Sequence, residues 1–267
     1  YYPEGPVIVN AEHLRMIFTE FEQPSAEEIA RRKEIASQNY GTMPGTEAAY
    51  AGAIVKALKP RTVLIIGEHK GILTDYLLDL APDDCLFFTC DLPQSMYSEA
   101  GYRSPDPINK SYVQHTDQEI GSAWRSRSDG RAERVFGFLG DSGNPETEWL
   151  IEALTERCDL VLVDGNHSRP AVEKDLQSAW RVLGDYGVVL LDDFNKLPRL
   201  KSVEYAMQHT RDYGAEFPFL YQVSWGIQGA LEVNSNLAVV IKARDPELIE
   251  RRESLRESLN SPALRQR

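Results

Sequence analysis

The sequence predicts an α/β protein built on a doubly wound, mostly parallel sheet. From residue 62 onward, apolar runs of strand length alternate with segments of helix length. These runs lack polar alternation, which is typical of parallel strands covered on both faces. The last two runs, residues 217–225 and 236–243, have no convincing helix between them. They predict an antiparallel hairpin at the far edge of the sheet.

Bulk properties narrow the class of protein. The 267 residues are enough for one large domain, and a net charge of −12 argues against an extended nucleic-acid surface. The apolar stretches are too short to span a membrane, and the N-terminus lacks a secretory pattern. Three sparse cysteines, Cys85, Cys90 and Cys158, are expected to be buried and reduced. We therefore expect a cytoplasmic protein without a membrane partner.

The opening segment, residues 1–60, is expected to be a helical cap or lid. In its first helix, Ser25 is the expected N-cap, Glu28 the capping-box partner and Gly41 the stop. A second helix over residues 45–60 should end at Pro60.

The core, residues 61–245, is expected to hold the sheet, and residues 246–267 a charged C-terminal helix, within a single domain overall. The predicted strands are residues 62–67, 85–91, 134–141, 159–164 and 187–193, and the predicted helices are residues 71–82, 146–155 and 168–184. The last of these helices carries an apolar stripe at helical spacing: Val172, Leu176, Ala179, Trp180 and Leu183.

The stretch 93–130 is long for a connection inside such a sheet. It is either a substrate lid or a surface excursion, with a short helix near residues 118–126.

The first strand runs into a glycine turn. Gly67 and Gly71 form a GxxxG pattern, and glycine there lets the backbone approach a ligand. A dinucleotide-binding turn would be GxGxxG, and His69 stands where its second glycine belongs. The pattern therefore favours a ligand without a pyrophosphate, such as S-adenosylmethionine.

The next two strands also end on polar residues. Asp91 stands 24 residues after Gly67, a spacing suited to accepting ribose hydroxyls. Asp141 and Ser142 follow the third strand, within reach of an adenine. Together, these three strand ends indicate a nucleoside ligand.

The fourth and fifth strands end on acidic residues: Asp164, Asp192 and Asp193. If the two strands are neighbours, about 4.8 Å apart, the carboxylates converge and repel unless a cation lies among them. Oxygen ligands suit Mg²⁺, Ca²⁺ or Mn²⁺, with Asn195 as a further candidate ligand. His167 could then accept a proton from a metal-held hydroxyl. Alternatively, Asp164 binds the ligand's ammonium group or caps a helix, and His167 is a surface residue.

With these motifs, the chain resembles the class I S-adenosylmethionine-dependent methyltransferases. It is closest to the small-molecule O-methyltransferases that include the catechol, caffeoyl-CoA and macrolide-sugar enzymes. The quoted motifs are "VLIIGEHKG", "TCDLP", "FLGDS", "LVDGNH" and "LLDDF", over roughly residues 40–243. The resemblance implies a Rossmann-like, seven-stranded sheet with an antiparallel last strand.

The resemblance also implies roles for individual residues. Asp164, Asp192 and Asp193 take the metal-ligand positions, with Mg²⁺ as the expected ion, and His167 takes that of the catalytic base. Gly41 to Met43 resemble the family's upstream segment that closes over the cofactor. The implied cofactor-binding residues are Gly67, Gly71, Thr74, Asp91, Asp141, Ser142 and Met43.

Two positions depart from the family pattern. Ile65 stands where an acid is common, and Leu73 stands in place of a serine, with the Thr74 hydroxyl beside it. Both weaken the expectation of how the methionine end of the cofactor is held.

The sequence thus predicts methyl transfer to a hydroxyl of a small molecule. Tyr221 and Trp225 are candidate walls of the acceptor pocket. A metal-independent methyltransferase and a non-catalytic cofactor-binding protein are the alternatives; a nicotinamide-dependent oxidoreductase is more distant. The acceptor is not identified, and a homodimer through the N-terminal helices is left open.

Overall fold

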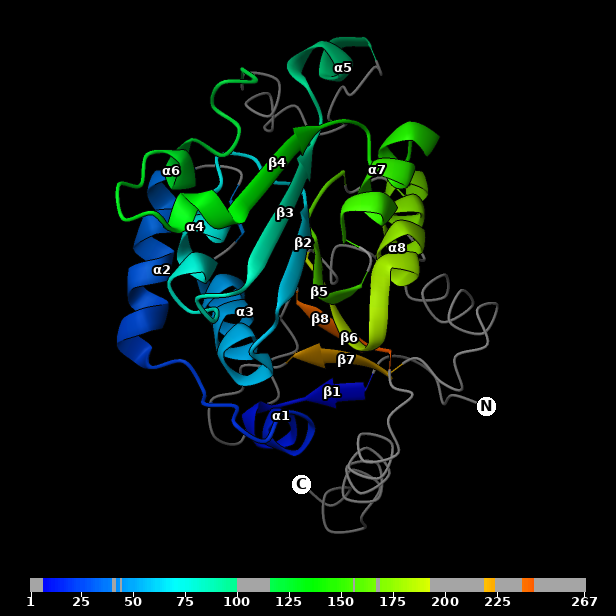
Figure 1. Ribbon diagram of the computed structural model, residues 1–267. Coiled ribbons are helices and arrows are strands. Elements are labelled where there is room, and N and C mark those ends of the chain that lie inside the picture. The colour runs from blue at the N-terminus through cyan, green and yellow to red at the C-terminus, as the bar shows by residue number, and fades with distance from the viewer. Residues whose placement is uncertain are drawn as a thin grey trace.

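The computed structural model describes residues 7–39, 42–43, 45–99, 116–155, 157–166, 169–192, 219–223 and 237–242. Within these ranges one sheet of eight strands forms the centre of the molecule, and helices cover both of its faces (Figure 1). The strands are β1 (Val7–Val9), β2 (Thr62–Ile66), β3 (Leu86–Asp91), β4 (Val135–Leu139), β5 (Cys158–Val163), β6 (Leu183–Leu191), β7 (Phe219–Val223) and β8 (Ala238–Ile241).

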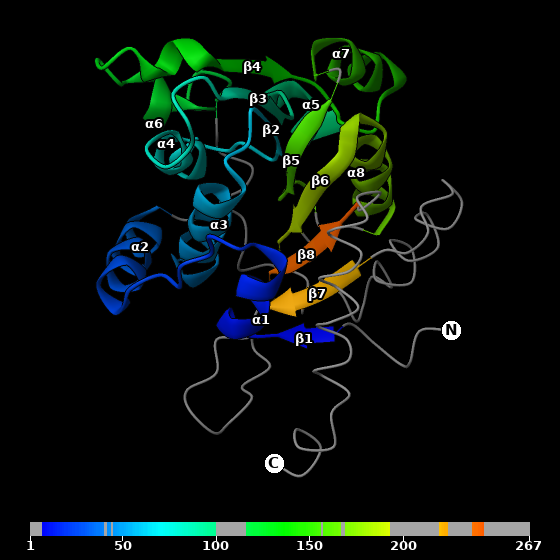
Figure 2. The same cartoon turned by 60° about the horizontal axis from the view of Figure 1, so that its bottom comes forward.

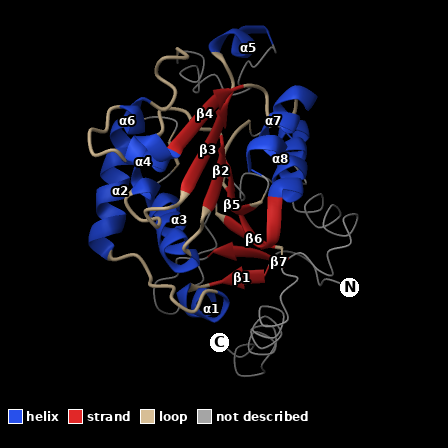
Figure 3. Ribbon diagram, viewed as in Figure 1, coloured by secondary structure: helices blue, strands red, loops and turns tan. Residues whose placement is uncertain are grey.

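The helices follow the predicted alternation with the strands (Figure 3). They are α1 (Ala11–Ile17), α2 (Ala26–Gln38), α3 (Gly45–Leu58), α4 (Ile72–Leu78), α5 (Gln94–Glu99), α6 (Ser122–Arg125), the 3₁₀ turn Arg131–Arg134, α7 (Pro145–Thr155) and α8 (Arg169–Val182). Among the described residues, no helix is long and apolar enough to cross a membrane.

The strand order is β1-β7-β8-β6-β5-β2-β3-β4. Strands β2 to β6 pair in parallel, as predicted, and β8 pairs antiparallel with both β6 and β7. The terminal antiparallel pair is therefore confirmed. Its position differs from the prediction, because β8 lies inside the sheet and β1 adds an eighth strand, parallel to β7, beyond it.

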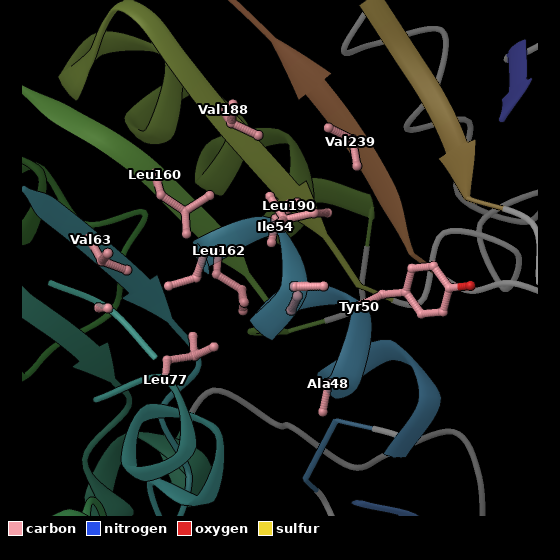
Figure 4. Packing of buried hydrophobic residues seen from close by; sticks show 14 of the residues in the cluster. Ala48, Tyr50, Ile54, Val63, Leu77, Leu160, Leu162, Val188, Leu190 and Val239 are labelled. Carbon is pink, nitrogen blue, oxygen red and sulfur yellow. The ribbon is translucent and has the colours of Figure 1, made fainter. Parts of the chain in front are cut away.

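Alternation along each central strand explains why both faces are covered. Val63 and Ile65 of β2 join one core cluster, and Leu64 and Ile66 join the other. The first cluster lies under α3 and α4, where Ile54 packs near Leu162 and Leu190 (Figure 4). The second lies under α7 and α8, on the opposite side of the sheet (Figure 2). All five residues of the predicted apolar stripe are buried: Val172, Leu176, Ala179 and Trp180 in α8, and Leu183, which is the first residue of β6 because the helix ends at Val182.

Helix α2 begins at the predicted N-cap, Ser25. The Ser25 hydroxyl caps α2 by accepting from the Glu28 amide at 3.1 Å. The Glu28 carboxylate contacts Arg32 Nε at 3.1 Å, one turn further along the helix. The predicted stop, Gly41, lies outside the described residues, and α2 ends at Gln38.

The segment 1–60 is more than a helical cap. Its β1 strand joins the sheet, and α3 supplies fully buried residues such as Ile54 and Val55 to the core. The three cysteines are free and buried, as predicted. Burial raises the pKa of Cys85 and of Cys158 to about 12.

Candidate active site

The strand order reverses between β2 and β5. From β2, the chain builds outward through β3 and β4 on one side and through β5 and β6 on the other. In open α/β sheets, ligands bind beyond the carboxyl ends of the strands at such a switch point. The predicted site residues follow these strand ends, so the topology gathers them at one edge.

The glycine turn after β2 is held in place by its close approach to β5. Gly67 has φ +95°, and a Cβ there would lie 2.0 Å from the Asp164 carbonyl oxygen. Its amide donates to the Cys90 carbonyl at 2.9 Å. The contact between the two strand ends therefore requires glycine at position 67, whether or not a ligand also approaches the turn.

The rest of this turn also uses left-handed backbone conformations. His69 has φ +50°, an uncommon value for a residue with a side chain. Gly71 has φ +75° and precedes α4, where a Cβ would lie 2.5 Å from Trp124 Cδ1. The backbone of His69 thus has a conformation that glycine usually adopts, although the turn has no glycine at this position.

Asp91 bonds directly to this turn. It is 8% exposed; its Oδ2 accepts the His69 amide, and its Oδ1 accepts the Leu92 amide at 2.7 Å. A carboxylate has about four acceptor positions, so these main-chain bonds are compatible with binding ribose hydroxyls. The ribose role itself stays a prediction.

Glu68 is a buried acid that the sequence analysis missed. It is 5% exposed, accepts the Thr74 hydroxyl at 2.6 Å and also accepts from Trp124 Nε1. Burial is the main cause that raises the pKa of Glu68 to about 8, and the Asp91 charge adds to it. The sequence did offer one signal for Glu68, its position directly after Gly67. No sequence signal indicated its contact with Trp124, 56 residues away.

Thr74, predicted to bind the cofactor, is fully buried and donates to Glu68, and its cofactor role stays a prediction. Met43 is 2% exposed and belongs to the core cluster under α3. Thr74 thus supports the turn through Glu68, and Met43 packs in the core; the cofactor role of Met43 stays a prediction.

The segment after β4 forms its own network. Asp141 Oδ1 accepts the Gly143 amide at 2.9 Å, and the Ser142 hydroxyl donates to the buried Asp175 of α8. Asp175 is a second residue that sequence reasoning missed. The pair Asp141 and Ser142 lies beyond the carboxyl end of β4, at the predicted edge, and its adenine contact stays a prediction.

The described part of the long connection packs against the glycine turn. The Gly121 amide donates to the His69 carbonyl at 2.8 Å, and the Ala123 amide to the Lys70 carbonyl at 2.9 Å. Residues 100–115 of this connection lie outside the described ranges. The C-terminal part of the predicted lid is thus part of the support of the turn.

Asp164 and Asp192 occupy matching positions on neighbouring strands. They follow Val163 and Leu191, which are register partners in β5 and β6. The Asp192 amide donates to the Val163 carbonyl at 3.0 Å, so the ladder continues into both residues. Asp192 is 6% exposed and Asp164 is half-buried. Two acidic residues at matching positions of neighbouring strands have the oxygen donors that a hard divalent cation prefers.

The remaining acceptor-side predictions lie outside the described residues. These are His167, Asp193, Asn195 and Trp225, and the side chain of Tyr221 is likewise not described. Within the described ranges, no group of three His, Cys, Asp or Glu residues is arranged to hold a metal ion. Asp164 and Asp192 are neighbours as predicted, and their role as metal ligands stays a prediction.

Comparison with known proteins decides the class. The sequence profile of a methyltransferase domain family matches residues 41–194, more than half of the chain. The chain belongs to this methyltransferase family. The matched range runs from the end of the α2–α3 connection to the residues just after β6, so it contains all the strand ends described above.

Solved structures agree with this assignment at the level of the fold. An O-methyltransferase from Bacillus cereus, in complex with SAH, superposes with a TM-score of 0.51 at 13% identity, covering 81% of this chain and 90% of that one. The SAH-bound methyltransferase PaMTH1 of Podospora anserina gives a TM-score of 0.51 at 12% identity, covering 88% and 95%. No curated protein matches the chain. The resemblance to class I methyltransferases and the Rossmann-like sheet are thus confirmed.

Proposed function

We propose that this methyltransferase transfers a methyl group from S-adenosylmethionine to a hydroxyl of a small molecule, with help from a divalent metal ion. One observation carries the proposal: the switch point of a methyltransferase-family sheet has a glycine turn with Asp91 on one side and Asp164 with Asp192 on the other. The solved O-methyltransferase from Bacillus cereus was crystallised with SAH, which supports the choice of donor.

On the donor side, Asp91 would accept the ribose hydroxyls, and the turn from Gly67 to Gly71 would lie against the nucleoside. Asp141 and Ser142 would contact the adenine. The Cys90 carbonyl and the Asp91 carboxylate hold the turn by hydrogen bonds, so little rearrangement would be needed on binding.

On the acceptor side, Asp164, Asp192 and Asp193 would hold Mg²⁺. When bound, the ion would lower the pKa of the acceptor hydroxyl. His167, three residues after Asp164, would remove the hydroxyl proton, because an imidazole titrates near neutral pH.

The transfer step conserves atoms and charge. The bond between the sulfonium sulfur and the methyl carbon breaks, and its electron pair stays on sulfur to give S-adenosylhomocysteine. The methyl carbon bonds to the acceptor oxygen, whose proton passes to His167. Since the methyl group is already electrophilic, the protein contributes mainly alignment and proton removal.

Calorimetric titration with S-adenosylhomocysteine, with and without Mg²⁺, tests both halves of the proposal. We expect binding in both conditions and a separate, Mg²⁺-dependent binding event. Absence of any binding would remove the donor assignment. Unchanged turnover after treatment with a chelator would leave a metal-independent methyltransferase.

The His167→Ala variant separates an enzyme from a binding protein. We expect it to bind S-adenosylhomocysteine as the parent does and to lose product formation over a panel of phenol, sugar and polyketide acceptors. If the parent itself forms no methylated product with any acceptor, the result favours a non-catalytic cofactor-binding protein. Light scattering of the same samples tests the homodimer.

A further inference from the structure

The carboxyl group of Glu68 lies at a junction of three elements. It follows Gly67 in the turn after β2, it accepts the Thr74 hydroxyl of α4 at 2.6 Å, and it accepts from Trp124 Nε1 of α6. Figure 1 shows α4 and α6 side by side at this end of the molecule. All three groups are buried: Glu68 is 5% exposed, Thr74 0% and Trp124 6%.

The same junction is closed by main-chain bonds on both sides of Glu68. On the sheet side, the His69 amide donates to the Asp91 carboxylate. On the α6 side, the Gly121 and Ala123 amides donate to the carbonyls of His69 and Lys70. Glu68 thus lies in a turn whose backbone is hydrogen-bonded to β3 on one side and to the α6 segment on the other.

We infer that Glu68 is a positioning residue that couples the cofactor-binding turn to α6, so that residues 116–125 set the shape of the turn. The inference rests on the proposed function, because it assumes that the turn binds the S-adenosyl nucleoside. Glu68 reaches the ligand through Asp91 and the turn backbone. Loss of its carboxyl oxygens leaves the Trp124 N–H and the Thr74 hydroxyl buried without their partner, which shifts the turn.

The protonation state of Glu68 makes the coupling dependent on pH. The charges that act on Glu68 are Asp91, which raises its pKa, and Arg125, which lowers it; His69 and Lys70 are its neighbours in the turn. Burial dominates and raises the pKa to about 8 from a usual 4.5. The hydrogen bonds from Thr74 and Trp124 lower the pKa and persist on ionisation, whereas burial and the Asp91 charge oppose ionisation. Because the folded-state pKa is raised, the turn is most stable with the neutral acid, and this stability is lost as the pH rises from 4.5 through about 8, when a buried charge forms near Asp91.

The test measures the affinity for S-adenosylhomocysteine between pH 6.5 and 9.5 in four variants. Glu68→Ala should bind on the order of tenfold more weakly at pH 7, since two buried donors lose their acceptor. Glu68→Gln can accept from Trp124 and donate to Thr74, so it should restore most of the affinity. Trp124→Phe, which keeps a ring but removes the N–H, should fall between them.

The pH profile separates coupling from a general loss of structure. In the parent, the affinity should decline above about pH 8, and in Glu68→Gln this decline should be absent. The fluorescence difference between the parent and Trp124→Phe should titrate over the same range. Glu148→Gln is the matched control: this acid of α7 accepts from Ser178 and Arg181 at 3.2 Å, far from the turn in the chain, and should leave the affinity and its pH profile unchanged.

The outcomes are distinguishable. If the parent does not bind S-adenosylhomocysteine, the proposed function fails and the inference fails with it. If the parent binds and Glu68→Gln keeps the parent's decline above pH 8, only the inference is overturned. Denaturation midpoints of all variants identify any that are simply unfolded, and Glu68→Gln and Trp124→Phe remain informative if Glu68→Ala does not fold.

Discussion

The two halves of the candidate site are built differently. In the donor half, beyond β2 and β3, the turn, Asp91 and Glu68 form a closed hydrogen-bond network with α4 and α6. In the acceptor half, beyond β5 and β6, the fold brings Asp164 and Asp192 to matching positions at the ends of neighbouring strands. The donor half is thus shaped by the protein itself, whereas the acceptor half concentrates charge that a bound cation would neutralise.

This difference has a consequence for mutagenesis. Donor-half residues contribute both to the stability of the fold and, in the proposal, to cofactor binding, so their substitution should change stability and affinity together. In the proposed mechanism Asp164 and Asp192 act on the acceptor side, so their substitution should change catalysis with little change in cofactor affinity.

The largest effect is expected where the two halves touch, at Gly67. In Gly67→Ala the new Cβ would collide with the Asp164 carbonyl at 2.0 Å, and φ +95° is itself unfavourable for alanine. We expect a loss of about 3 kcal/mol of unfolding free energy or more, measured by urea denaturation.

Gly130→Ala provides the control for the backbone conformation alone. Gly130 has φ +79°, and a Cβ there meets nothing within 4 Å. Its loss should be about 1 kcal/mol, the cost of the left-handed conformation without a collision. Equal losses in the two variants would mean that the contact between the strand ends is unimportant.

A smaller and crossed effect is expected from Asp91→Asn and Asp192→Asn. Asp91→Asn should weaken binding of S-adenosylhomocysteine about tenfold, since a charged acceptor of the ribose hydroxyls is lost. Asp192→Asn should leave that affinity within about twofold. It should lower turnover on the order of 100-fold and raise the Mg²⁺ concentration required, because an acceptor-side charge is removed.

Measurement of both properties in both variants decides whether the two halves are separate. Affinity is obtained by calorimetry, and turnover by product formation at saturating donor over a range of Mg²⁺ concentrations. If Asp192→Asn weakens binding of S-adenosylhomocysteine as strongly as Asp91→Asn does, the two halves act as one unit. If Asp192→Asn turns over normally without added metal, Asp192 is not a metal ligand.

The same contrast explains how much the sequence could predict. The strand ends were predictable, because buried parallel strands are continuous apolar runs such as Leu160 to Val163, and the polar residue that follows each run is visible. Asp164 and Asp192 were expected to be neighbours if their strands were, and the β5–β6 register confirms this.

What the sequence could not predict depends on contacts between distant segments. The bond of Glu68 to Trp124 joins residues 56 apart, and neither residue type is unusual in its own segment. β1 has only three residues, too few for a periodic signal, and pairs with β7 more than 200 residues later in the chain. The place of β8 between β6 and β7 follows from the order of the strands in the sheet, which a predicted hairpin alone does not fix.

The smallest expected effect uses the cysteines as local probes of the two halves. Cys90 precedes Asp91 in the donor half, and its thiol donates to the Gly140 carbonyl at 3.5 Å. Cys85 directly precedes β3, at the end of that strand opposite to Asp91, and Cys158 is the first residue of β5. Burial raises the pKa of all three thiols, so labelling by a thiol reagent should be slow and should require local opening.

In variants that retain one cysteine each, S-adenosylhomocysteine at ten times its Kd should slow labelling of Cys90 about tenfold, because the ligand binds only the closed donor half. Labelling of Cys85 and Cys158 should slow less than twofold, since their opening leaves the nucleoside contacts in place. Labelling rates followed by mass spectrometry give the comparison directly. Equal protection of all three thiols would mean that they open only by global unfolding, and the donor half would then lack a stability of its own.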